Sequence, residues 1–126
     1  MMNDSNTGYS ASVNKRSIGR IWEKKAADYL RNNGYEILYF NYRTRYSEID
    51  IIAQDRDALV FVEVKYRRTL SQGDPLEAVD YRKQRRIINA ALCFLKDKGY
   101  DIDNTSIRFD VIGILGDDIK HIKNAF

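Results

Sequence analysis

The first clear periodicity in the chain is helical and lies between Ser17 and Gly34. Apolar residues recur there every three or four positions, as a buried helix face requires: Ile18, Ile21, Trp22, Ala26, Tyr29 and Leu30. Ser17 is a suitable N-cap, and Gly34 is a suitable C-terminal stop. Glu23 is in line with Ala26 and Leu30, so the pattern predicts that Glu23 lies at the edge of the buried face.

The rest of the chain alternates between strand patterns and one further helix. Strand-like segments cover residues 35–43, 48–54, 58–66, 106–115 and 119–126. A capping box begins at Asp74, with Pro75 at the first helical position, and helical spacing then continues to Gly99. The order of elements is therefore helix, three strands, helix and two strands. This order predicts one α/β domain with a central sheet flanked by helices.

Composition agrees with a single folded domain preceded by a tail. The chain has 126 residues, of which 44% are hydrophobic and 31% are charged, and it contains one Pro. These values suit a compact α/β protein and exclude a chain that is disordered throughout. Residues 1–16 are rich in Asn and Ser and lack periodicity, so we expect a disordered N-terminal tail followed by a domain over residues 17–126.

Charge and cysteine content narrow the function classes. The net charge of +3 and the pI of about 9.0 favour an anionic partner, although only weakly. Cys93 is the single cysteine, which excludes an intrachain disulfide and a zinc site built on several thiolates. No apolar run approaches the roughly 20 residues that a membrane-spanning helix needs. We therefore expect a cytoplasmic protein without a membrane partner.

The segments 48–54 and 58–66 form a predicted hairpin that carries charges within apolar strands. If its turn lies between Arg56 and Asp57, opposite residues have numbers that sum to 113, and Asp50 stands opposite Glu63. Opposed Cβ atoms are about 4.5 to 5.5 Å apart, so these two carboxylates would repel each other unless a cation lies between them. Oxygen ligands of this kind suit Mg²⁺ or Mn²⁺ better than zinc.

Lys65 follows Glu63 by two residues and therefore shares its face of the strand. An ammonium beside a metal can hold the attacking water and stabilise charge on a phosphate. The alternative is a solvated surface ion pair, which a Glu-x-Lys motif on a strand usually is. Apolar residues occupy both faces of segment 58–62, so this strand is expected to be covered on both sides, with its charged end at the rim of a cleft.

These motifs together resemble the PD-(D/E)XK restriction-endonuclease-like superfamily, which has a helical Glu, then an Asp, then Glu-x-Lys a dozen or so residues later. The chain is most similar to the YraN-like family of predicted bacterial nucleases, and its spacing is also similar to that of archaeal Holliday junction resolvases. The resemblance covers residues 18–126 through the segments "AADYLRNNGYEIL", "EIDIIA", "LVFVEVK", "PLEAVDYRKQRRI", "RFDVIGI" and "HIKNAF". It implies a restriction-endonuclease-like αβββαβ core with a central mixed sheet.

The resemblance also implies a role for each charged residue. Asp50 and Glu63 would bind the metal, Lys65 would be the catalytic lysine, and Glu23 would be an accessory catalytic carboxylate. Glu48 would be a neighbour without an assigned role. The implied activity is an endonuclease that depends on Mg²⁺ or Mn²⁺ and hydrolyses DNA phosphodiester bonds in recombination or repair, leaving a 5′-phosphate and a 3′-hydroxyl.

Two positions depart from the family pattern. Ser47 stands where the family usually has Gly before the Glu-Ile-Asp motif, and Trp22 stands where it has a small residue before the helical Glu. Neither departure removes a predicted ligand. Trp22 is large enough to narrow the approach to the site.

The second helix carries the basic run "YRKQRRI". Two interpretations stay open: a solvated helix face, or a surface that contacts phosphates without reading sequence. In the second interpretation Gln84 turns toward the cleft, and the nucleic-acid-binding residues are Lys83, Gln84, Arg85 and Arg86. Elsewhere, His121 has no second histidine to share a metal, so we expect it to be structural. Asp110 is expected either to support the site or to cap a neighbouring backbone.

Three functions are compatible with these features. The first is the metal-dependent endonuclease, with DNA, including branched DNA, as its partner and with a homodimer as one arrangement. The second is a nucleic-acid-binding protein of the same fold that does not cut. The third is an adaptor that docks a recombination helicase. Metal binding would separate the first function from the third.

Overall fold

The computed structural model describes residues 11–126, apart from the side chains of residues 11–18, 72, 77 and 78. Its helices and strands are α1 (Ala11–Asn32), β1 (Glu36–Arg43), β2 (Glu48–Asp55), β3 (Ala58–Arg67), α2 (Tyr81–Asp97), β4 (Ile107–Leu115) and β5 (Asp118–Ile122). Three short 3₁₀ turns accompany them, namely η1 (Leu70–Gln72), η2 (Pro75–Ala78) and η3 (Ile102–Asn104). The predicted order of helices and strands is confirmed.

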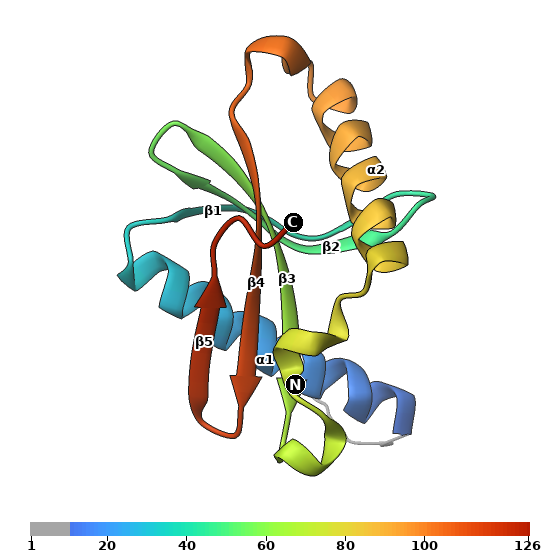
Figure 1. The fold of residues 1–126 in the computed structure, drawn as a ribbon, viewed down its shortest axis with the longest axis vertical. Coiled ribbons are helices and arrows are strands. Elements are labelled where there is room, and N and C mark those ends of the chain that lie inside the picture. The colour runs from blue at the N-terminus through green and yellow to red at the C-terminus, as the bar shows by residue number, and fades with distance from the viewer. Residues whose placement is uncertain (1–10) are drawn as a thin grey trace, which may run out of the picture.

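The strands form one mixed sheet with the order β1-β2-β3-β4-β5 (Figure 1). Only the β3–β4 pair is parallel among these strands, and the other three neighbouring pairs are antiparallel. Parallel neighbours need a long crossover connection, which here contains α2. The predicted α/β fold with a central mixed sheet flanked by helices is confirmed.

The two helices cover opposite faces of the sheet. Residues Ala26, Ala27 and Leu30 of α1 pack with Val60 and Val62 of β3. On the other face, Ile87, Ala90, Ala91, Phe94 and Leu95 of α2 pack with Leu59 and Phe61 of the same strand. Segment 58–62 is therefore buried on both sides, as its sequence predicted.

The β2–β3 hairpin has the predicted register. The pairs Ile51–Val62 and Ala53–Val60 both have numbers that sum to 113. The turn lies at Arg56, whose φ of 56° is in the left-handed region, and Asp57. Continued by one residue, this register places Asp50 opposite Glu63.

The first helix starts earlier than predicted. The predicted N-cap, Ser17, lies inside α1, which begins at Ala11. The apolar pattern marks where one helix face becomes buried, and the backbone can be helical before that point because residues 11–17 contain no Pro or Gly. Most of the predicted tail, residues 1–10, lies outside the described residues.

The second helix begins later than predicted. Asp74 caps only the short turn η2, where it accepts the N–H of Leu76 at 2.9 Å. A new N-cap, Asp80, accepts the N–H of Lys83 at 2.8 Å and starts α2. Packing explains the interruption, because a Cβ on Gly113 of β4 would lie 2.8 Å from Leu76, so η2 is pressed against the sheet there.

No helix within residues 11–126 is both long and apolar enough to cross a membrane.

The last strand is shorter than the predicted 119–126. It ends at Ile122, and Asn124 then takes a φ of 55°, which turns the chain back toward β4. The N–H of Ala125 donates to the carbonyl oxygen of Phe109 at 2.6 Å, and Phe126 stacks on Phe109. An aromatic anchor on the sheet thus replaces the end of the predicted strand.

Candidate active site

Four carboxylates from three elements gather between α1 and the first turn of α2. They are Glu23 of α1, Glu48 and Asp50 of β2, and Glu63 of β3. Glu23, Glu48 and Asp50 each place one carboxylate oxygen within 4.8 Å of the others. The structure therefore brings the predicted Glu23, Asp50 and Glu63 together and adds Glu48, to which the sequence assigned no role.

The Asp50 side chain contacts the backbone of β3 and lies beside another carboxyl group. Its Oδ2 accepts the N–H of Val64 at 2.8 Å, which ties the side chain to β3. Burial raises the pKa of Asp50 well above its usual value, and a hydrogen bond with Glu63 and the Glu63 charge raise this pKa further. Burial and the neighbouring carboxylate therefore both disfavour the charged form of Asp50, and a cation bound between the two carboxylates would relieve this repulsion.

Glu63 is the most deeply buried member of the group. Its exposed fraction is 4%, and its Oε2 is a buried oxygen without a hydrogen bond. The nearest cations are Lys83 Nζ at 3.5 Å and Lys65 Nζ at 3.8 Å. Both distances exceed that of a direct hydrogen bond, so Oε2 retains coordination capacity for a further cation.

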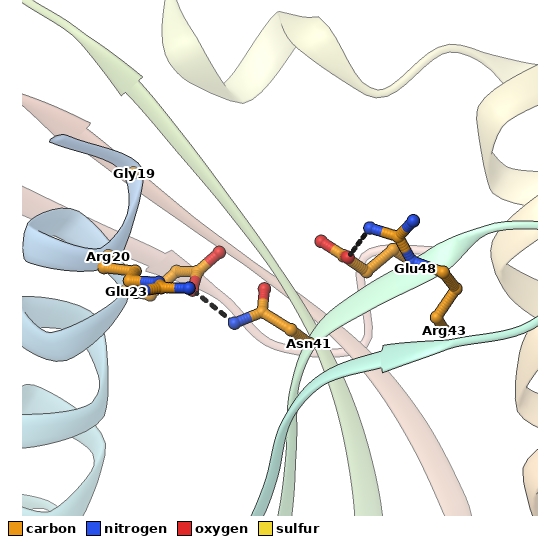
Figure 2. A pocket seen from close by; sticks show the side chains of 6 residues that line it. All are labelled: Gly19, Arg20, Glu23, Asn41, Arg43 and Glu48. Atoms are coloured by element: carbon orange, nitrogen blue, oxygen red, sulfur yellow. Dashed lines mark hydrogen bonds and ion pairs between the residues drawn. The ribbon is translucent and has the colours of Figure 1, made fainter. Parts of the chain in front are cut away.

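A pocket of about 540 Å³ opens beside this group. It is lined by Gly19, Arg20, Glu23, Asn41, Arg43 and Glu48 (Figure 2). Asn41 Nδ2 donates to Glu23 Oε1 at 2.9 Å, and Arg43 donates to Glu48 Oε2 at 2.9 Å. Burial raises the pKa of Glu23, the Asn41 hydrogen bond opposes this effect, and the charge of Glu48 adds to it.

Arg20, Asn41 and Arg43 were not predicted from the sequence. All three line the pocket, and two of them bind its carboxylates. The only available signal was Asn41, a polar residue that interrupts the aromatic run of segment 39–42. Nothing local in the sequence distinguishes Arg43 from the exposed Arg45 two residues later.

Trp22 supports the site from beside it. Its ring stacks on Tyr66 with a centroid distance of 3.7 Å and an interplanar angle of 11°. This stack joins α1 to β3 one residue away from both Glu23 and Lys65. From this packing we infer that Trp22 fixes the position of Glu23 relative to Lys65.

The basic run on α2 divides into residues near the site and residues away from it. Lys83 reaches the buried Glu63, as described above. Gln84 Nε2 donates to the carbonyl oxygen of Val79 at 3.3 Å, and so binds the chain just before the helix. Arg85 and Arg86 are exposed, with Arg85 donating to the hydroxyl of Tyr81 at 3.2 Å. Phosphate binding by these residues stays a prediction.

The predicted structural role of His121 agrees with its contacts. His121 Nε2 lies 2.7 Å from Asp110 Oδ2, and its Nδ1 lies 3.3 Å from the Tyr29 hydroxyl. Asp110 also accepts the N–H of Asn124 at 3.1 Å, so of its two predicted roles the structure supports backbone capping. These residues occupy the β4–β5 side of the sheet.

The donor set fits a hard divalent cation. Four carboxylates supply oxygen ligands only, which Mg²⁺ and Mn²⁺ prefer. Such a cation would bond the buried Glu63 Oε2, which has no hydrogen bond, and would offset the repulsion that raises the pKa of Asp50.

Comparisons with known proteins agree on one family. The model of the family described as "Uncharacterised protein family UPF0102" matches residues 22–114. A UPF0102 protein of Persephonella marina is 46% identical over 108 residues, which cover 86% of this chain and 91% of the relative. One from Lachnoclostridium phytofermentans is 47% identical over 114 residues, covering 90% and 96%. One from Alkaliphilus oremlandii is 46% identical over 118 residues, covering 90% and 100%. The matched span contains all four carboxylates and Lys65.

Proposed function

The chain belongs to the uncharacterised protein family UPF0102, the YraN-like family, and from its site we propose that it is a metal-dependent endonuclease that hydrolyses DNA phosphodiester bonds. One observation carries the proposal. The buried Glu63 has an unbonded oxygen beside Asp50, and Lys65 lies 3.8 Å from that oxygen. Two carboxylates and a lysine in this order supply what a hydrolytic phosphodiesterase requires.

Asp50 and Glu63 would hold Mg²⁺ or Mn²⁺, with Glu23 and Glu48 close enough to bind the same ion or its waters. The ion, when bound, would polarise the phosphate and lower the pKa of a bound water. The backbone bond from Val64 keeps Asp50 oriented before the ion arrives. This preorganisation limits the rearrangement needed for catalysis.

Lys65 is the residue proposed to act on the reacting atoms. Its side chain is 26% exposed, so its ammonium can reach a bound substrate while Glu63 holds it near the site. There it would orient the attacking water or stabilise the negative charge that develops on the phosphate. The buried position of Glu63 shows that this part of the site is shielded from water, and the lower local dielectric strengthens both effects.

The proposed substrate is branched or distorted DNA in recombination or repair. This part rests on the similarity of motif spacing to Holliday junction resolvases. A homodimer and a recombination helicase partner belong to the same proposal. Neither changes the chemistry assigned to Asp50, Glu63 and Lys65.

The test combines cleavage with metal binding. The wild type, Asp50→Asn and the control Asp57→Asn, which changes an exposed residue at the turn of the same hairpin, are each incubated with Mg²⁺ or Mn²⁺ and duplex, flap, splayed and four-way DNA. We expect the wild type and the control to cut at least one substrate. Asp50→Asn should lose the activity and also the Mn²⁺ binding seen by calorimetry.

Two results would contradict the proposal in different ways. Cleavage by Asp50→Asn at the wild-type rate would show that the site is wrong. A wild type that binds Mn²⁺ and DNA but cuts none of the four substrates would favour a binding protein of the same fold.

A further inference from the structure

Two side chains of β1 bind the carboxylates that a cation would use. Asn41 binds Glu23, and Arg43 binds Glu48, each at 2.9 Å. Both residues line the same pocket, and each donor meets a carboxylate there (Figure 2). These hydrogen bonds occupy carboxylate oxygens that a cation would also use.

The backbone of Asn41 is in an unusual conformation for a strand. Its φ is 52°, in the left-handed region, where Asn is tolerated better than most residues. Its neighbours Phe40 and Tyr42 pair with Ile51 and Ile49, so Asn41 lies opposite Asp50 in the β1–β2 register. Strained conformations of this kind cluster at ligand-binding and active sites, because strain is retained where it orients a functional group.

We propose that Asn41 and Arg43 are substrate-positioning residues that exchange partners. They bind Glu23 and Glu48 in the cation-free protein, and they bind a phosphate of the DNA after a divalent cation has taken those carboxylates. The inference rests on the proposed function and deepens it, because it identifies where the substrate phosphate is held and why the cation must bind first.

The energetics favour an exchange of this kind. Arg43 is 80% exposed and Glu48 is 34% exposed, and ion pairs so accessible to water change an equilibrium by at most about fivefold. The pair is therefore easily opened. A guanidinium then offers two parallel donors that match the oxygen atoms of a phosphate, and a charge-assisted contact of that kind is stronger than the pair it replaces.

Charge explains the order of binding. Without a cation, a phosphate entering the pocket would meet the negative charges of Glu23 and Glu48. A bound divalent ion offsets much of this negative charge and frees Arg43, which with Arg20 across the pocket then supplies positive charge facing the phosphate. DNA affinity should consequently depend on the cation, and this dependence should be weaker when Arg43 is replaced.

The test uses Arg43→Met, with Arg45→Met as the matched control. Arg45 is an exposed arginine on the same hairpin that donates to the Tyr46 hydroxyl and is not among the residues lining the pocket. Mn²⁺ affinity is measured by calorimetry without DNA. DNA affinity is measured by fluorescence anisotropy with Ca²⁺ in place of Mg²⁺, to slow cleavage, over a series of salt concentrations.

In Arg43→Met, Mn²⁺ affinity and DNA affinity should change in opposite directions. Arg43→Met removes a competitor for Glu48, so Mn²⁺ affinity should rise by about two- to fivefold. DNA affinity with Ca²⁺ should fall by at least about tenfold, and the slope of log K against log salt should become shallower by about 0.9. Arg43→Lys should restore part of the DNA affinity, and Arg45→Met should leave Mn²⁺ affinity unchanged.

The failures of the two proposals can be told apart. A wild type that binds no Mn²⁺ would overturn the proposed function. A wild type that binds Mn²⁺ and DNA, with Arg43→Met equal to wild type in both assays or weaker in both, would overturn only the exchange, because a merely structural arginine gives one of those two patterns.

Discussion

Two groups of buried acidic side chains lie on this sheet, and they differ in what surrounds them. On the β4–β5 side, the fully buried Asp110 accepts hydrogen bonds from Arg108, His121, Tyr35 and the N–H of Asn124. Burial alone would raise the pKa of Asp110, but the hydrogen bonds from His121 and Arg108 hold it well below its usual range. This carboxylate is charged and fully bonded.

The site carboxylates show the opposite arrangement. Asp50 and Glu23 have raised pKa values, because each is partly removed from water and each lies beside another acidic group. Glu63 nearby has a buried oxygen without a hydrogen bond. A buried charge with a full set of donors is complete as a structural element, whereas buried carboxylates packed against one another need a ligand to be complete. On this difference we base a structural role for Asp110 and the proposed functional role of Asp50 and Glu63.

The largest expected effect is on stability, at Asp110. Asp110→Ala leaves the half-buried Arg108 with only Asp55 as a carboxylate partner and leaves the buried His121 without one, so the free energy of unfolding should fall by about 3 to 5 kcal/mol. Urea unfolding measures the change, with Asp57→Ala at the exposed hairpin turn as control. A loss of less than about 1 kcal/mol would show that Asp110 is not a structural carboxylate.

The next largest effect is on catalysis, at Lys65. Lys65→Met keeps the aliphatic stem and removes the ammonium, so cleavage should slow by about a hundred- to a thousandfold, equivalent to about 2.7 to 4 kcal/mol. Metal and DNA affinity should change little, because the interaction is strongest in the transition state. A folded, metal-loaded Lys65→Met that cleaves at the wild-type rate would show that this lysine has no catalytic role.

The smallest effect has the opposite sign to the first. Asp50→Asn removes a carboxylate whose ionisation is unfavourable in the cation-free protein, so at pH 8 the variant should be more stable than wild type by about 0.5 to 2 kcal/mol. Because the native state raises the pKa of Asp50, wild type regains this stability by binding a proton as pH falls through that raised pKa.

Urea unfolding of wild type and Asp50→Asn at several pH values, each with and without Mn²⁺, measures this effect. The advantage of the variant should shrink toward acidic pH, and it should reverse with Mn²⁺, which stabilises only wild type. An Asp50→Asn protein that is less stable than wild type at every pH without metal would place Asp50 with the structural carboxylates.

Much of the site was predictable because it depends on short-range geometry. A two-residue turn and the alternation of side chains in strands determine the register, and this register places Asp50 opposite Glu63 and Lys65 beside Glu63. Glu23 was found at the edge of the helix face for a similar reason, since helical periodicity is local. The chemical inference of a cation site followed from these positions alone.

Other features were decided by contacts between distant segments. The packing of Leu76 on Gly113 interrupts the predicted second helix, so α2 begins at Tyr81 with Lys83 against Glu63. Where a helix begins and how it is rotated depend on the surfaces it packs against, and a periodic pattern describes only its own face. The turn of Asn124 that ends β5 likewise depends on binding to Asp110 and on the stacking of the last residues on β4.

The sequence by itself determined the order of elements, the hairpin register and the predicted ligand pair, because each follows from periodicity and turn length within one segment. Only the tertiary structure decided which other groups reach these ligands. Arg43 stands directly opposite Glu48 across the turn between β1 and β2, so that contact is local. Asn41 binds Glu23 because an irregular stretch of β1 lies beside α1. This contact joins residues 18 positions apart through the packing of two elements, and no local pattern records that packing.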